Sequence, residues 1–253
     1  MNILTELRRR NKMLFWFGLF NMVVGVACIL LQFTDDAVLL GVNRWLKPMK
    51  FYLSVGIMTF TMNWLLYYLS NKKKVILFSW MIVITMFFEN GCIMMQAIRG
   101  TTSHFNITSS FNGMVFSIMG LLILTFTITC IFIAGSFFQQ KQFNISPAYL
   151  WGIRLGLVLF ILFSIQGGMM VGLLKHTVGA NDGSEGLPVL NWSKQYGDLR
   201  VAHFMGIHAL QILPLMGFYI AKSKNQLFLY AGLYFIFASA LFIQAVKGIP
   251  LFF

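Results

Sequence analysis

The chain has 253 residues, of which 58% are hydrophobic and 10% are charged, and its mean hydropathy is +0.76. One soluble core cannot hide so much apolar surface, so these values exclude a soluble domain and indicate an integral membrane protein. The formal net charge of +12 is read as a topology signal and as attraction to lipid, and nothing in it suggests a nucleic-acid partner.

Apolar stretches of about 18 or more residues are expected to be membrane-spanning helices, because a hydrocarbon core of about 30 Å needs about 20 helical residues. Backbone groups in lipid must be hydrogen-bonded within the segment, which favours helices. We therefore predict an all-α fold, a seven-transmembrane-helix bundle that forms a single integral membrane domain over residues 1–253. The predicted spans are 13–33, 49–69, 75–97, 114–136, 149–174, 199–221 and 227–247.

Basic residues are distributed unequally between the two sides of these spans. One side carries them in short segments: Arg8, Arg9, Arg10, Lys12, Lys72, Lys73, Lys74, Lys141, Lys222 and Lys224. The other side mixes basic residues with acids: Asp35, Asp36, Asp182, Glu185 and Asp198. By the positive-inside rule the first side is cytoplasmic, which predicts a cytoplasmic N-terminus and an extracytoplasmic C-terminus.

Several cations lie at the outer ends of the predicted spans. Near the start of the second span, Pro48 suits a first helical turn, Trp45 suits an interfacial aromatic belt, and Lys47 can reach lipid headgroups. Arg99 ends the third span and Lys247 the seventh. If several of these side chains point inward, they form a cationic mouth suited to a carboxylate, a phosphate group or a haem propionate.

The third span contains an acid, Glu89, about 12 Å beneath the outer helix end at about 1.5 Å per residue. An ionisable group inside a span costs roughly 2.5–3.5 kcal/mol at the bilayer centre, so Glu89 should face the bundle interior or water. Gln96 shares its helical stripe and Arg99 lies at the margin. Glu89 is then a neutral hydrogen-bond donor, a proton carrier, half of an ion pair, or a structural acid bonded to a neighbouring helix.

The sixth span begins after Asp198, a good N-cap, and carries His203, His208 and Gln211 in its first half. A spacing of five residues separates the imidazoles by about 140°, so they cannot bind one ion as an i, i+4 pair does. A metal would need ligands from other helices, and His104, in the connection after the third span, is the remaining candidate.

His208 and Glu89 fall at similar depth, which predicts a carboxylate–imidazole pair if the third and sixth spans touch. Such a pair could relay protons or orient a ligating imidazole, whereas the alternative is a histidine satisfied within a polar helix interface. Pro214 is expected to kink the sixth span beside a cavity. In the fifth span, Gly152-xxx-Gly156 and Gly168-xxx-Gly172 should allow close helix approach.

Two short patterns recur at equivalent places. The third and seventh spans end in the same order of residues, Gln96-Ala97-Ile98-Arg99-Gly100 and Gln244-Ala245-Val246-Lys247-Gly248, and a weaker similarity precedes the second and sixth spans, at residues 43–47 and 191–194. Together they suggest two parallel three-helix repeats joined by the fourth span, an architecture known in transporters. The alternative is coincidence, since glutamine and cations are common at helix ends.

The segments KPMKF, QAIRGTTSHFN and DLRVAHFMGIHALQILPLMG together resemble a group of uncharacterised bacterial polytopic membrane proteins. The resemblance covers most of the chain. It implies location in a bacterial plasma membrane, as a multi-pass protein, and it brings no activity with it.

Three functions remain open from the sequence. The first is transport or binding of a small anionic ligand in an outward-facing polar cavity, with Glu89 and His208 as proton-linked groups. Its further candidate ligand-binding residues are Lys47, Gln96, Arg99, His203, Gln211 and Lys247. The second is a membrane oxidoreductase that binds haem or a transition metal through His104, His203 or His208. The third is a structural or accessory membrane subunit, and the sequence indicates neither a substrate nor an oligomeric state.

Overall fold

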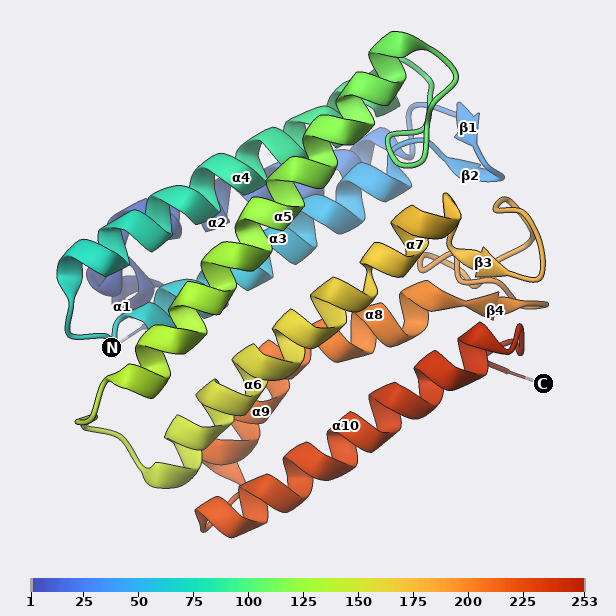
Figure 1. The fold of residues 1–253 in the computed structure, drawn as a ribbon. Coiled ribbons are helices and arrows are strands. Elements are labelled where there is room, and N and C mark those ends of the chain that lie inside the picture. The colour runs from blue at the N-terminus through green and yellow to red at the C-terminus, as the bar shows by residue number, and fades with distance from the viewer. Residues whose placement is uncertain (1, 253) are drawn as a thin grey trace. The chain divides into compact units, whose positions relative to one another are not determined.

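A computed structural model describes residues 2–252, and the chain is mostly helical, at 70%. It forms two compact units, residues 1–129 and 130–253, and the boundary between them falls inside one long helix. Figure 1 shows that each unit is built from helices with one short strand pair. The prediction of one integral domain over residues 1–253 stays a prediction.

The first unit contains a short helix, three long helices, a strand pair and most of the boundary helix. Its elements in chain order are α1 (Ile3–Arg10), α2 (Lys12–Leu31), β1 (Val38–Leu39), β2 (Val42–Asn43), α3 (Leu46–Leu66), α4 (Lys72–Ile98) and α5 (Ser110–Gln139). The antiparallel hairpin of β1 and β2 turns at Leu40 and Gly41, which both have positive φ, as a two-residue hairpin turn requires.

The second unit also contains long helices and a strand pair, and two of its helical segments are interrupted. After the end of α5 come α6 (Pro147–Gln166), α7 (Gly168–Leu173), β3 (Thr177–Val178), β4 (Gly197–Asp198), α8 (Leu199–Ile207), α9 (Ala209–Tyr219) and α10 (Lys224–Val246). Strands β3 and β4 pair antiparallel, near the two ends of the loop 175–198. Asp198 caps α8 by accepting a hydrogen bond from the Arg200 amide, which confirms the predicted start of this helix.

Six helical segments among the described residues are long and apolar enough to cross a membrane, which indicates a multi-pass membrane protein. They are Lys12–Leu31, Lys72–Ile98, Ser110–Gln139, Pro147–Leu173, Leu199–Tyr219 and Lys224–Val246. The remaining predicted span, 49–69, corresponds to α3, which has 21 residues but is not among the six. Lys47, Lys50 and Asn63 make α3 more polar than its neighbours. Seven spans, their orientation and the repeat therefore stay predictions.

Glycines set the closest helix contacts within each unit. A Cβ on Gly152 would lie 2.5 Å from the carbonyl oxygen of Leu213, and one on Gly156 would lie 2.8 Å from that of Ala209, so α6 and α9 touch at backbone distance. This confirms the packing role predicted for this pair. The second pair is different: a Cβ on Gly168 or Gly172 would meet nothing within 4 Å, so the prediction of close approach there was wrong.

The sixth predicted span is interrupted at His208 rather than at Pro214, which lies inside α9. The His208 imidazole Nδ1 lies 2.6 Å from the carbonyl oxygen of Phe204, the same oxygen that accepts from the His208 amide at 3.3 Å. A side chain inserted into the backbone ladder is a common cause of a helix break. The histidine, and not the proline alone, therefore accounts for the interruption.

The ends of α4 and α10 share one backbone geometry. In each, the cation is the C-cap residue and the following glycine, Gly100 or Gly248, has a φ of +69° or +75°. Each glycine amide bonds the carbonyl three residues earlier, and the next amide bonds the carbonyl of the glutamine, Gln96 or Gln244. This is the Schellman arrangement, in which glycine is favoured because positive φ carries little strain for it.

Candidate functional site

Glu89 is the central candidate of the first unit. It lies on α4, its side chain is 1% exposed, and neither carboxyl oxygen has a hydrogen-bond partner among the described residues. The prediction that it faces inward is confirmed. Buried polar groups without partners are rare and costly, and a buried charge costs more, so this carboxyl requires a functional or structural explanation.

Other polar side chains besides Glu89 are buried on α4, on α2 and on α3. The adjacent Asn90 is equally buried and donates to the side-chain oxygen of Asn21 on α2, at 2.8 Å. Thr85, one turn earlier, is buried and bonds the carbonyl of Met81 in its own helix. Thr59 on α3 is buried with its hydroxyl unbonded. The first unit therefore contains buried polar groups whose hydrogen-bonding capacity is only partly used within the described residues.

Lys47 is a cation of the same unit as Glu89. It lies near the start of α3. Its ammonium nitrogen also lies 5.9 Å from the ring centre of Phe51. Two of the predicted ligand-binding residues, one acidic and one basic, thus belong to one unit and lie on two different helices.

Gln96 and Arg99 also belong to one cluster, at the end of α4. The fully buried Gln96 amide donates to the side-chain oxygen of Asn112 on α5 at 3.1 Å, and Arg99 donates to Gln96 at 2.7 Å and to Asn112 at 3.1 Å. The Arg99 guanidinium lies over Phe111, 4.4 Å from the ring centre. These bonds use neutral acceptors, so they leave the charge of Arg99 uncompensated. Sequence reasoning missed Asn112, because nothing in its spacing marks it as a partner.

Trp45 does not belong to an interfacial belt, which corrects the sequence prediction. It is buried, and its indole nitrogen donates to the Asp35 carboxylate at 2.7 Å. Arg44 forms an ion pair with the same carboxylate. A hydrogen bond from the Ala37 amide, followed by those from Arg44 and Trp45, holds the pKa of Asp35 below its usual value. The tryptophan is therefore part of a polar clasp that fixes the β1–β2 hairpin to the start of α3.

The two span histidines of the second unit are oriented alike. The Nδ1 atom of His203 lies 2.8 Å from the carbonyl oxygen of Phe163 on α6, and that of His208 lies close to Phe204. A carbonyl can only accept, so Nδ1 carries the hydrogen in both rings and a neutral ring keeps its lone pair on Nε2. His203 also packs against Gly167, at the break between α6 and α7.

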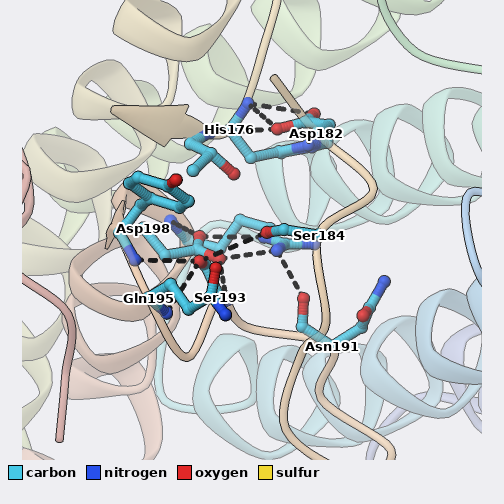
Figure 2. Close-up of polar contacts among 10 residues, drawn as sticks. His176, Asp182, Ser184, Asn191, Ser193, Gln195 and Asp198 are labelled. Carbon is cyan, nitrogen blue, oxygen red and sulfur yellow. Dashed lines mark hydrogen bonds and ion pairs between the residues drawn. The ribbon is translucent and has the colours of Figure 1, made fainter. Parts of the chain in front are cut away.

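The loop between α7 and α8 is ordered by two aspartates (Figure 2). Asp182 accepts from the backbone amides of His176 and Thr177 and lies 2.5 Å from Nδ1 of His176. Burial raises the pKa of Asp182, but the hydrogen bonds and charge of His176 outweigh it and leave this pKa below its usual value. Asp198 accepts from the Ser193 amide and from the Arg200 guanidinium. Two anchored carboxylates thus hold the loop over the start of α8.

Two further predicted residues and one unpredicted residue lie in the second unit. Lys247 is the C-cap of α10, and Gln211 is half-buried on α9. Gln166, at the end of α6, was not predicted, and both of its side-chain polar atoms are buried with no partner within residues 2–252. A cavity of about 10 Å³ beside α10 is lined by Asp198 and Gln244, among others, which is at the lower limit for one water.

The candidate residues are divided between the two units. Glu89, Lys47, Gln96, Arg99 and His104 belong to the first unit. His203, His208, Gln211 and Lys247 belong to the second. The Glu89–His208 pair joins residues of different units and stays a prediction.

Metal-ligating side chains do not gather within residues 2–252: no group of three or more His, Cys, Asp or Glu side chains is close enough to hold a metal ion. Nδ1 of His104 lies 3.1 Å from the Ser103 hydroxyl, and its ring lies 5.6 Å from that of Phe51. His104 belongs to the first unit, and His203 and His208 belong to the second.

The fold and these residues define a helical multi-pass membrane protein with an unbonded carboxyl buried in one of its long apolar helices. Comparisons with family models, with curated proteins and with solved structures find no match.

Proposed function

We propose that the protein is a proton-linked membrane carrier of a small anionic solute, with Glu89 as the group that takes up and releases the proton. The observation that carries the proposal is the buried Glu89 carboxyl, whose two oxygens have no hydrogen-bond partner. Lys47 and Arg99, which lie in the same unit, are proposed to attract the anion.

Electrostatics supports a proton-carrying role for this carboxyl. An isolated carboxylate in a low-dielectric interior pays a large desolvation cost, whereas the neutral acid pays much less. Two states therefore become comparable in free energy: a neutral carboxyl in the empty protein, and a charged one when water or Lys47 compensates it. A group balanced in this way exchanges a proton when access or the nearby charge changes, as acidic residues do in pumps and transporters.

The internal order of the two units supports transport over a purely structural role. Each has a first helix, a strand pair, a second helix in close glycine contact with the first, and a third helix that ends in a Schellman cap. Parallel repeats of this kind are one known basis of carriers. A similar cap is common at helix ends and by itself is weak support for a repeat. The support for transport therefore comes from the similar order of helices and strands in the two units.

The test is proton-coupled uptake by the purified full chain in proteoliposomes, with panels of carboxylate and phosphate solutes. With an imposed proton gradient, the wild type should accumulate at least one solute, and Glu89→Gln should abolish accumulation while exchange of labelled solute without a gradient persists. Glu185→Gln is the matched control, because it removes a carboxyl whose side chain is 73% exposed. Gradient-driven uptake by Glu89→Gln at the wild-type rate would refute the proposal.

A second candidate, a haem- or metal-binding oxidoreductase, is favoured by one observation. Both span histidines have Nδ1 directed at a carbonyl, which is how ligating imidazoles are commonly oriented, with Nε2 left for the ligand. An absorption spectrum and metal analysis of the purified protein test it: a Soret band that His208→Ala abolishes would support it, and a colourless, metal-free protein would remove it. If His208→Ala and Glu89→Gln change only stability or assembly, an accessory subunit remains.

A further inference from the structure

Cations from three helices of the first unit gather around one tyrosine, Tyr67. They come from α1, from the end of α3 and from the start of α4. The Arg9 guanidinium lies 5.3 Å from the ring centre of Tyr67 and donates to its hydroxyl at 3.4 Å. The Arg10 guanidinium lies 4.5 Å from that ring centre. The Lys72 ammonium lies 5.5 Å from it and donates to the Tyr67 carbonyl. Residues far apart in the sequence thus form one cationic site.

The acid in this cluster is already used. Glu6 is buried and pairs with both Arg9, at 2.7 Å, and Arg10, at 2.8 Å. These hydrogen bonds lower the pKa of Glu6 to about 2, so it is charged at neutral pH and compensates one of the two arginines. Glu6 balances only one of the two arginine charges, and no carboxylate is among the described contacts of Lys72. The cluster therefore keeps a net positive charge.

Arg10 fixes the cluster in place. Its guanidinium stacks 3.7 Å from the ring centre of Trp64 and donates to the Trp64 carbonyl at 3.1 Å, while the Glu6 carboxylate holds its other side. The arginine is nearly buried, with 9% of its side chain exposed, against 53% for Arg9. The buried cation is structural, whereas Arg9 is paired with Glu6 but is exposed enough to reach a ligand as well.

Further cations surround this centre with no acid among them. Lys73 and Lys74 are exposed in the first turn of α4, which contains no acidic residue, although cations at a helix N-terminus are disfavoured by the helix dipole. Arg8 is exposed and lies over the ring of Trp16, at 5.6 Å. An anion placed here would relieve repulsion among all of these groups.

The apolar side chains beside the cluster identify where the anion comes from. Ile3 and Leu4 on α1 are 64% and 50% exposed, and Trp16, at the start of α2, is 54% exposed. A short helix with exposed aliphatic residues, arginines at its end and a neighbouring exposed tryptophan fits the interface of a bilayer, with the apolar groups among the acyl chains and the cations among the headgroups. A free phosphate would give no reason for this apolar border.

We propose that the site formed by Arg9, Tyr67 and Lys72, with Arg8, Lys73 and Lys74 around it, binds the phosphate headgroups of anionic phospholipids. The proposal needs only that the chain spans a membrane, and it is independent of transport and of Glu89. The bound lipid would fix α1 against the ends of α3 and α4.

The experiment uses the full chain purified in a neutral detergent. Binding of phosphatidylglycerol is measured by native mass spectrometry and by thermal stabilisation, with phosphatidylcholine and inorganic phosphate as comparison ligands. Lys73→Gln/Lys74→Gln removes two exposed charges that make no described hydrogen bond or ion pair. Lys222→Gln/Lys224→Gln is the matched control, since it removes two exposed lysines at the start of α10.

A lysine near an anionic lipid surface contributes about 1 kcal/mol, which is about fivefold in affinity, so Lys73→Gln/Lys74→Gln should bind phosphatidylglycerol about 25-fold more weakly than the wild type. The control should bind within about twofold of the wild type. A wild type that does not prefer phosphatidylglycerol to phosphatidylcholine overturns the proposal. So does equal stabilisation by inorganic phosphate, or an equal loss in the control.

Discussion

Replacement of Gly152 by alanine tests the helix packing of the second unit. The added Cβ would lie 2.5 Å from the carbonyl oxygen of Leu213 and 3.0 Å from its carbonyl carbon and from the Cα of Pro214. All three atoms are backbone, so no side-chain rotation can relieve the contact, and α6 must move away from α9. Overpacking of this kind costs about 1–3 kcal/mol, which for a chain of this size lowers Tm by roughly 2–12 °C relative to a variant that gains only the helix propensity of alanine.

Gly232→Ala is the matched control, because Gly232 is mid-helix in α10 and a Cβ there would meet nothing within 4 Å. Both variants gain the helix propensity of alanine, about 1 kcal/mol, so the difference between them isolates the packing cost. The assay is thermal unfolding of the purified chain in one detergent, followed by circular dichroism. A Gly152→Ala protein that melts at or above the temperature of Gly232→Ala would refute the packing described for α6 and α9.

Three further outcomes are expected. The pKa of Glu6 falls from 4.5 to about 2 on folding, so its pairing stabilises α1 above pH 4.5 and is lost as the pH falls from 4.5 towards 2. Hydrogen exchange in α1, corrected for intrinsic rates, should therefore become faster over that pH range. Unchanged protection of α1 at pH 2 would contradict this. Nitrogen NMR of labelled His203 should show a protonated Nδ1 in the neutral ring, and a protonated Nε2 would exclude the bond to Phe163. Trp45→Phe should loosen the β1–β2 hairpin, because it removes the indole donor to Asp35; a double-mutant cycle with Asp35→Ala measures this, and additive effects would contradict it.

The sequence predicted the helices well because a membrane-spanning helix needs a minimum length, and the length of an apolar stretch can be counted in the sequence. Each predicted span corresponds to a helical segment with ends within a few residues, and the inward position of Glu89 followed from the cost of a carboxyl in lipid. The cap at Asp198 was equally local, since a side chain two residues before an amide needs no tertiary information.

Contacts between separated residues were not predictable in the same way. Asp35 meets Trp45 only because a two-residue turn reverses the chain between them, and Asn112 meets Gln96 only because α5 packs on the end of α4. The break at His208 was missed for a different reason. Proline is the usual cause of a kink, whereas an imidazole bonded to the carbonyl four residues earlier is visible only in the rotamer.

The boundary helix α5 has 30 residues, so it is about 45 Å long at about 1.5 Å per residue, against a hydrocarbon core of about 30 Å. It must either lean steeply or carry whole turns beyond the acyl region. Because the helix is continuous across the division between the units, a change in its tilt would move residues of both units. Bilayer thickness is therefore a physical variable to which this protein should respond, and reconstitution in lipids of graded chain length would reveal it.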